Sequence, residues 1–152
     1  MMTYYALGQY AVYISGPIDQ DDIKSGLYSK EDLEIPRAPN NDALNSTIQV
    51  LLQGMINKKK NLQKSACTAL EMVILQASKK MMNYVQVLIQ VLNAAFTQYH
   101  ISNTRLLCNI ITALSDAVGK AGLIANEGEL IKALMTMLQQ KLQDRCSLED
   151  EV

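Results

Sequence analysis

The sequence has little of what builds catalytic and metal-binding sites. It contains one histidine and no tryptophan, and its three cysteines are widely spaced without a CxxC pair. Such cysteines predict neither a disulfide framework nor a zinc site. No Gly-rich phosphate loop and no nucleophile–base pair can be recognised, and His100 is interpreted as a solvated residue of a turn. We therefore expect neither an enzyme nor a bound cofactor or metal, and a small helical enzyme is the disfavoured alternative.

Long apolar runs are also missing. Hydrophobic residues make up 49% of the chain, but polar residues interrupt them every few positions. No window supplies the roughly 20 apolar residues of a membrane span. The first apolar stretch, residues 4–14, has no basic residue before it and so does not resemble a secretory signal. Arginine occurs only at positions 37, 105 and 145, without interleaved aromatic residues, which disfavours direct binding of nucleic acid. These absences favour a protein of the cytoplasm or nucleus.

What the sequence does contain is a helical pattern. Apolar residues recur at helical spacing in residues 2–14, 44–56, 62–77, 81–99, 106–118 and 130–142. Asn126 with Glu129 forms a plausible capping pair for the last of these helices. Gly119 and Gly122 suit the end of the helix before it. The pattern predicts an all-α protein.

The predicted helices repeat. A shift of 40 residues superposes Ile48 on Leu88 and Ile56 on Phe96, and a shift of 42 carries Leu92 onto Leu134. The helices between them repeat at a shift of 44. A period of about 40–47 residues built from two helices is typical of HEAT or armadillo repeats. We expect an α-solenoid of antiparallel helix pairs, with an ordinary helical bundle as the alternative.

The repeats predict how the chain is divided. Residues 2–14 would be the second helix of one repeat, 43–78 and 80–120 two complete repeats, and 126–143 the first helix of a further one. The chain would then be a fragment with half-repeats at both ends. Residues 15–42 contain all three prolines and are interpreted as an acidic, solvated inserted loop.

Three stretches match a known family in their order and spacing. They are LGQYA at 7–11, LQKSACTA at 62–69, and AFTQY at 95–99 with its continuation to LSDAVG at 114–119. Together they resemble the transportin branch of the karyopherin, or importin-β, family of nuclear import receptors, in its middle HEAT repeats. The resemblance spans nearly the whole chain except residues 15–42.

The resemblance implies a function and partners. Such a receptor binds nuclear localisation signals of cargo proteins, in extended form, on a concave surface of inner helices, and it shuttles between cytoplasm and nucleus. Nucleoporins and Ran would be partners of the full-length receptor, with the Ran site outside this segment. Neither nucleic acid nor a membrane would be a direct partner.

The resemblance also implies site residues. Tyr5 falls at the family's signal-contacting aromatic position, and Asp116 at one of its acidic contacts. Gln9 falls where the family has an arginine, and Asn109 and Leu75 fall where it has acids. The candidate cargo-binding residues are Tyr5, Gln9, Asn109 and Asp116.

Charge is unevenly distributed along the chain. Residues 15–42 hold seven acids and three bases, a net charge of −4, whereas residues 43–143 hold four acids and ten bases, a net charge of +6. A positive surface weakens electrostatic capture of a basic signal. The sequence therefore leaves open a second hypothesis, a HEAT-repeat scaffold of another protein assembly with no import role.

Overall fold

The described part of the chain is all-α, as the sequence predicts. The computed structural model describes residues 2–99 and 101–150, and their side chains except at 2, 3, 101, 121, 125–127, 129 and 144–150. His100 lies outside the described residues. No strand occurs within these ranges, and none of their helices is both long and apolar enough to cross a membrane.

Eight α-helices and one 3-10 helix follow one another along the described residues. In order they are α1 (Met2–Gln9), α2 (Ala11–Ile14), α3 (Gln20–Lys24), α4 (Lys30–Glu34), α5 (Asp42–Met55), α6 (Lys60–Ala77), the 3-10 helix η1 (Ser78–Tyr84), α7 (Val85–Gln98) and α8 (Ile101–Asp150).

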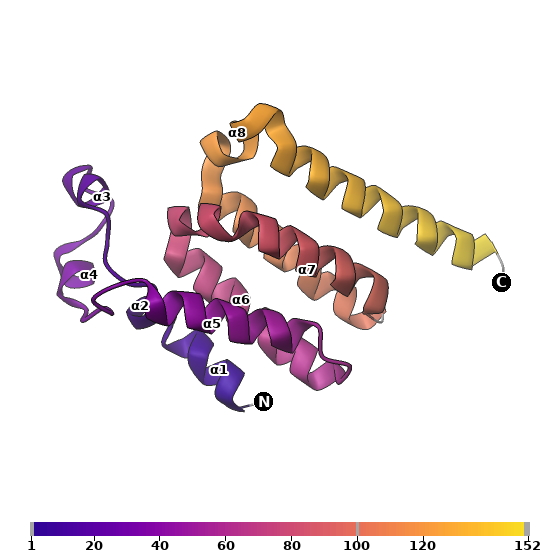
Figure 1. The fold of residues 1–152 in the computed structure, drawn as a ribbon, viewed down its shortest axis with the longest axis horizontal. Helices are drawn as coiled ribbons and strands as arrows, with labels where there is room; N and C mark the ends of the chain where they lie inside the picture. Colours follow the sequence, from indigo (N-terminus) through magenta and orange to yellow (C-terminus); the bar gives the residue numbers. More distant parts are fainter. Residues whose placement is uncertain (1, 100, 151–152) are drawn as a thin grey trace.

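Helix α6 lies at the centre of a two-layer stack. It contacts α1 on one side, α8 on the other, and also packs on α5. Figure 1 shows α5 and α7 side by side in the nearer layer, with α6 and the first half of α8 behind them. Successive long helices run in opposite directions, so α1, α6 and the first half of α8 point the same way. This arrangement is the predicted α-solenoid of helix pairs.

Burial repeats along the chain as the fold does. The buried positions of α6 return 44 residues later in α8, at Gln63/Leu107, Ala66/Ile110, Cys67/Ile111, Ala69/Ala113, Leu70/Leu114, Val73/Ala117 and Ile74/Val118. If the apolar stripes resembled each other only by chance, equivalent positions of the two helices would not be buried one after another. The repeat is therefore a property of the packing as well as of the sequence pattern.

The structure corrects the register predicted for α5 and α7. At the predicted shift of 40, Ile56 would match Phe96, yet Ile56 is 48% exposed and Phe96 only 4%. A shift of 44 instead pairs buried residues throughout: Leu44/Leu88, Ile48/Leu92, Leu51/Ala95, Leu52/Phe96 and Met55/Tyr99. The two shifts differ by one helical turn, and residues four apart share a helix face. An apolar stripe alone cannot distinguish them.

Helix α8 also differs from the prediction. Instead of a helix end at Gly119 and Gly122 and a new start at Asn126, the helix is continuous over Ile101–Asp150 and folds back on itself (Figure 1). Gly119 and Gly128 have φ values of 65° and 72°, a left-handed conformation that glycine adopts without a Cβ clash. The chain thus reverses direction without an extended linker. The side chains of Asn126 and Glu129 are outside those described, so their capping pair stays a prediction.

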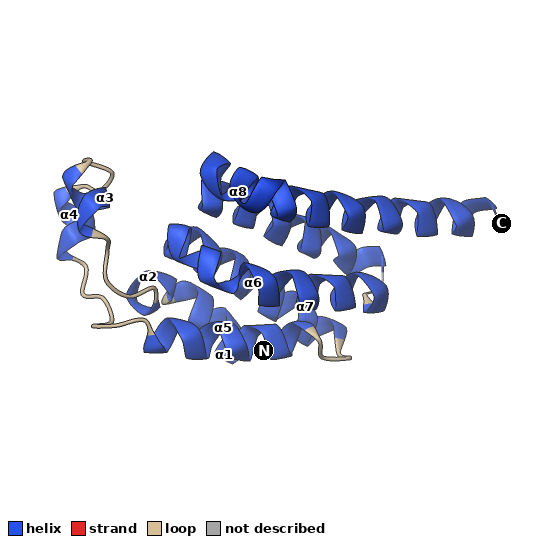
Figure 2. Cartoon of the chain, turned by 45° about the horizontal axis from the view of Figure 1, so that its top comes forward, coloured by secondary structure: helices blue, strands red, loops and turns tan. Residues whose placement is uncertain are grey.

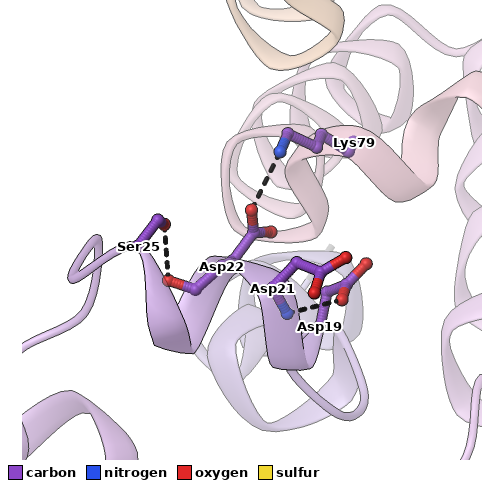
Figure 3. Close-up of polar contacts among 5 residues, drawn as sticks. All are labelled: Asp19, Asp21, Asp22, Ser25 and Lys79. Carbon is purple, nitrogen blue, oxygen red and sulfur yellow. Dashed lines mark hydrogen bonds and ion pairs between the residues drawn. The ribbon is translucent and has the colours of Figure 1, made fainter.

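The segment 15–42 carries two short helices that the sequence pattern did not predict. The Asp19 carboxylate accepts a hydrogen bond from the Asp21 amide at the start of α3, and Ser29 forms a reciprocal capping box with Asp32 at the start of α4. Neither helix has a buried residue. Both stand apart from the stack in Figures 1 and 2. Figure 3 shows the Asp22 carboxylate paired with Lys79 of η1 at 2.8 Å, which ties α3 to the repeats.

The C-terminal end of α5 is closed by side chains from later in the chain. The Tyr99 hydroxyl donates to the Met55 carbonyl at 2.6 Å. The Gln63 amide donates to the Asn57 carbonyl at 2.7 Å, and the Gln98 amide to the Ile56 carbonyl at 3.3 Å. Carbonyls at a helix end have no partner within the helix, so these donors satisfy groups that would otherwise be unpaired.

Candidate protein-binding surface

The candidate cargo-binding residues lie on the three parallel helices of one layer. We call the exposed side of α1, α6 and the first half of α8 (residues 101–120) the α1–α6–α8 face. Tyr5 and Gln9 come from α1, and Asn109 and Asp116 from α8. Tyr5, Gln9 and Asp116 are exposed, while Asn109 is half-buried. All four residues therefore lie on the α1–α6–α8 face, two on each side of α6.

The rotation of α1 about its axis is fixed by close packing. A Cβ on Gly8 would come within 3.1 Å of the Ala69 backbone, so α1 meets α6 closely at this point. On another side of α1, Tyr4 packs against α5. A Cβ added to Gly54 of α5 would lie 3.1 Å from the Tyr4 hydroxyl. With these two contacts made, Tyr5 points away from the core and its side chain is 60% exposed.

The rotation of α8 is set in the same way by its buried positions. Leu107, Ile110 and Leu114 are fully buried. Asp116 follows Leu114 by two residues, about 200° further around a helix with 3.6 residues per turn. Its carboxylate is consequently directed to solvent rather than into the stack.

Tyr5 and Asp116 are not brought together into one compact pocket. Helix α6 lies between the helices that carry them, and neighbouring helix axes are about 8–10 Å apart, so the two side chains are on the order of 20 Å apart. A single small ligand cannot contact both. An extended polypeptide rises about 3.3 Å per residue, so roughly six residues would span the distance.

Helix α6 adds an apolar side chain between these two positions. Leu75 occupies a position where the resembled family has an acid, and its side chain is 52% exposed. A leucine can make apolar contacts with a bound peptide but cannot pair with a basic side chain.

Charges on the α1–α6–α8 face are arranged along the helices. Lys64 and Arg105 lie in the N-terminal halves of α6 and of the α8 limb, while Glu71 and Asp116 lie toward the C-terminal ends, before Lys120. The acids that could attract a basic peptide are thus gathered on one half of the face. The net positive charge of residues 43–143 is not spread evenly over it.

The buried thiol on this layer is held in its protonated form. Burial raises the pKa of Cys67 to about 11, and its sulfur lies 3.4 Å from the Tyr99 hydroxyl. At neutral pH it is protonated, and a thiol is a poor nucleophile and metal ligand. Among the described residues no group of histidine, cysteine and acidic side chains could hold a metal ion.

Comparison with known proteins identifies similar chains. No protein-family model matches the sequence. It is 30% identical over 94 residues to importin subunit beta-2 of Schizosaccharomyces pombe, a match covering 62% of this chain and 10% of that protein. It is 29% identical over 107 residues to transportin of Dictyostelium discoideum, covering 70% of this chain and 11% of the relative. The chain is karyopherin-like in sequence.

The matches cover a small part of each relative. The chain spans about a tenth of the length of the curated relatives it matches. Their names are those of transport proteins and not of enzymes, in agreement with the sequence analysis.

Proposed function

We propose that the chain is a protein-binding segment of a transportin-like nuclear import receptor, and that its α1–α6–α8 face binds the nuclear localisation signal of a cargo protein. The observation that carries the proposal is the placement of Tyr5 and Asp116 on one exposed face, on the two helices that flank α6. Similarity to importin subunit beta-2 and transportin supports it.

The spacing of the candidate residues favours an extended peptide. Tyr5 offers an exposed aromatic ring on which a proline or aromatic side chain of the signal stacks. Asp116, on the far side of α6, pairs with a basic side chain of the signal. An exposed pair of this kind contributes only about 0.2–1 kcal/mol, so the charge contact tunes binding rather than supplying it.

The two amides provide the remaining polar contacts. Gln9 follows Tyr5 by one helical turn, and Asn109 precedes Asp116 by two. An amide side chain both donates and accepts, so each can bond the backbone of a peptide in extended conformation. Their neutrality makes this site less selective for charge than one with an arginine and an acid at the same positions.

The wider role follows from the same proposal. The segment would belong to the middle HEAT repeats of the receptor, with nucleoporins and Ran as partners of the full-length protein and the Ran site elsewhere in it. The receptor would shuttle between cytoplasm and nucleus.

The resemblance to the transportin branch implies localisation signals that contain a proline–tyrosine pair, and titration with a peptide of this type tests the proposal. We expect weak, saturable binding to the chain, which Tyr5→Ala and Asp116→Lys each weaken. Tyr10→Ala is the matched control, because Tyr10 is 59% exposed but lies about 140° around the helix from Tyr5. Asp21→Lys repeats the charge change of Asp116→Lys on α3, away from the face.

The outcomes distinguish the proposal from its alternative. Loss of affinity in the two site variants with unchanged controls supports the cargo surface. Absence of binding, or equal effects in site and control variants, overturns the assignment and leaves a HEAT-repeat scaffold as the better account. Amide-shift mapping of the bound peptide onto α1, α6 and α8 gives a second, independent readout.

A further inference from the structure

A cavity of about 260 Å³ lies where the segment 15–42 meets the repeats. Its walls come from Ser15, Tyr28 and Arg37 on one side and from Ser78, Lys79 and Lys80, at the start of η1, on the other. Pockets for drug-sized ligands are about 300–1,000 Å³, so this one suits a smaller group. It is distinct from the α1–α6–α8 face.

Two cations converge on Ser15 inside this cavity. The Arg37 guanidinium donates through Nη1 to the Ser15 hydroxyl at 3.2 Å, and Lys80 donates through Nζ to the Ser15 carbonyl at 2.6 Å. Both acceptors are neutral, so neither positive charge is compensated by them. The Tyr28 ring lies 5.9 Å from the guanidinium carbon, a cation–π contact that orients Arg37.

The acidic residues in the cavity wall make their contacts with groups other than Arg37 and Lys80. Asp22 and Asp19 also line it, but Asp22 pairs with Lys79 at 2.8 Å, and Asp19 caps α3 (Figure 3). The hydrogen bond and charge of Asp22 raise the pKa of Lys79. Burial and the nearby Arg37 charge instead lower the pKa of Lys80. Lys80 thus lies in an environment that is short of negative charge.

One donor nitrogen of Arg37 has no acceptor within the described part of the chain. Its Nε is a buried side-chain nitrogen without a hydrogen-bond acceptor, the exception among the described residues. Buried polar groups in folded proteins are nearly always paired, and a buried donor left unpaired costs about 1–3 kcal/mol. An arginine donor and a half-buried lysine that share a small cavity are a typical arrangement for an oxyanion.

We propose that this cavity binds a phosphate group, held between Arg37 and Lys80 beside Ser15. Arg37, Lys79 and Lys80 outnumber Asp19 and Asp22 in the cavity wall, so an anion is favoured there. The tetrahedral oxygens of a phosphate can accept from donors on two sides, whereas a carboxylate presents only two oxygens in one plane. The guanidinium fork and the ammonium supply the charge-assisted hydrogen bonds that phosphate oxygens accept. The phosphate belongs either to the free ion or to a phosphorylated side chain, which share this chemistry.

Titration of the chain with inorganic phosphate at constant ionic strength, followed by amide shifts, tests the site. We expect saturable binding with a dissociation constant of about 1 mM, centred on residues 15–37 and 78–80. A phosphorylated side chain has its second pKa near 6, and that of inorganic phosphate lies about one unit higher, so the affinity of each falls as the pH drops through its own value. Sulfate remains a dianion over the same range, and its affinity stays constant. A phosphoserine peptide that binds more tightly than phosphate would assign the source to a modified protein, and equal affinities would assign it to the free ion.

Variants separate binding from folding. Arg37→Gln removes the guanidinium, and Gln76→Glu places a carboxylate in the cavity wall while leaving both cations in place. We expect each to weaken phosphate binding at least about tenfold. Lys24→Gln is the control, because it removes one exposed positive charge at the end of α3 without changing the cavity wall, and we expect the phosphate affinity to stay within about twofold. Shifts that fail to saturate at tens of millimolar phosphate, or equal losses in Lys24→Gln and Gln76→Glu, would overturn the proposal.

Discussion

The repeat helices and the segment 15–42 are held in place by different forces. In the repeats, apolar side chains are buried at regular intervals of one repeat, and the packing of one pair depends on the next. In the segment 15–42, α3 and α4 have no buried residue and are stabilised by caps, an ion pair and contacts to Ser15. Apolar burial is worth far more than exposed polar contacts. The same kind of substitution should therefore have unequal effects in the two regions.

Truncation of leucine gives the largest expected contrast. Leu70→Ala and Leu114→Ala each remove a fully buried side chain at equivalent positions of two repeats, and we expect each to lower the free energy of unfolding by about 2–5 kcal/mol. Leu33→Ala, at an exposed position of α4, should change it by less than about 0.5 kcal/mol. Urea denaturation followed by circular dichroism measures both. Similar losses at Leu33 and Leu70 would contradict the contrast.

Removal of one hydroxyl gives a smaller effect. Tyr99→Phe leaves the Met55 carbonyl without its 2.6 Å donor in a buried site, so we expect a loss of about 1–3 kcal/mol. Tyr5→Phe removes an exposed hydroxyl and should be neutral. Thermal melting of the two variants compares them directly. A neutral Tyr99→Phe would show that solvent replaces the lost donor.

Acidification gives the smallest effect, and it is confined to α4. Hydrogen bonds from the Ser29 hydroxyl and amide hold the pKa of Asp32 below its ordinary value of 3.8. A lowered pKa means that the capping contribution is complete above 3.8 and is lost as the pH falls through the lower folded-state value. We expect the Ser29 amide resonance to shift in that window, and Asp32→Asn to abolish the shift. Amides of α6 should not follow the same titration.

The general fold could be predicted from the sequence because the spacing of the apolar residues shows both the helical period and the length of the repeat. The register that relates α5 to α7 could not be predicted. Shifting Ile48 onto Leu88 or onto Leu92 places a buried apolar residue on a buried apolar residue in either case. The two shifts differ at Ile56, which is exposed, whereas Phe96 is buried. The change of direction at Gly119 could be predicted, because glycine favours the left-handed backbone at a helix end, but the helical turns that continue through the reversal could not.

The residues of the candidate surface were predicted from a resemblance to a known family. The cavity beside Ser15 was not predicted from the sequence. Tyr5 and Asp116 stood out because family positions fall on them, while their shared face required the packing of α1 and α8 on α6. Arg37 and Lys80 are 43 residues apart in sequence, and each is unremarkable alone. Only the return of the segment 15–42 to Ser15 brings them together.

The donors that close the end of α5 also have a consequence for shape. Tyr99 belongs to a later repeat than the Met55 carbonyl it bonds, so this hydrogen bond fixes how far one helix pair is rotated against the next. In a solenoid that small rotation, multiplied over many pairs, sets the superhelical pitch and the curvature. A phenolic oxygen between two helix pairs therefore contributes to the curvature of the stack that the pairs form.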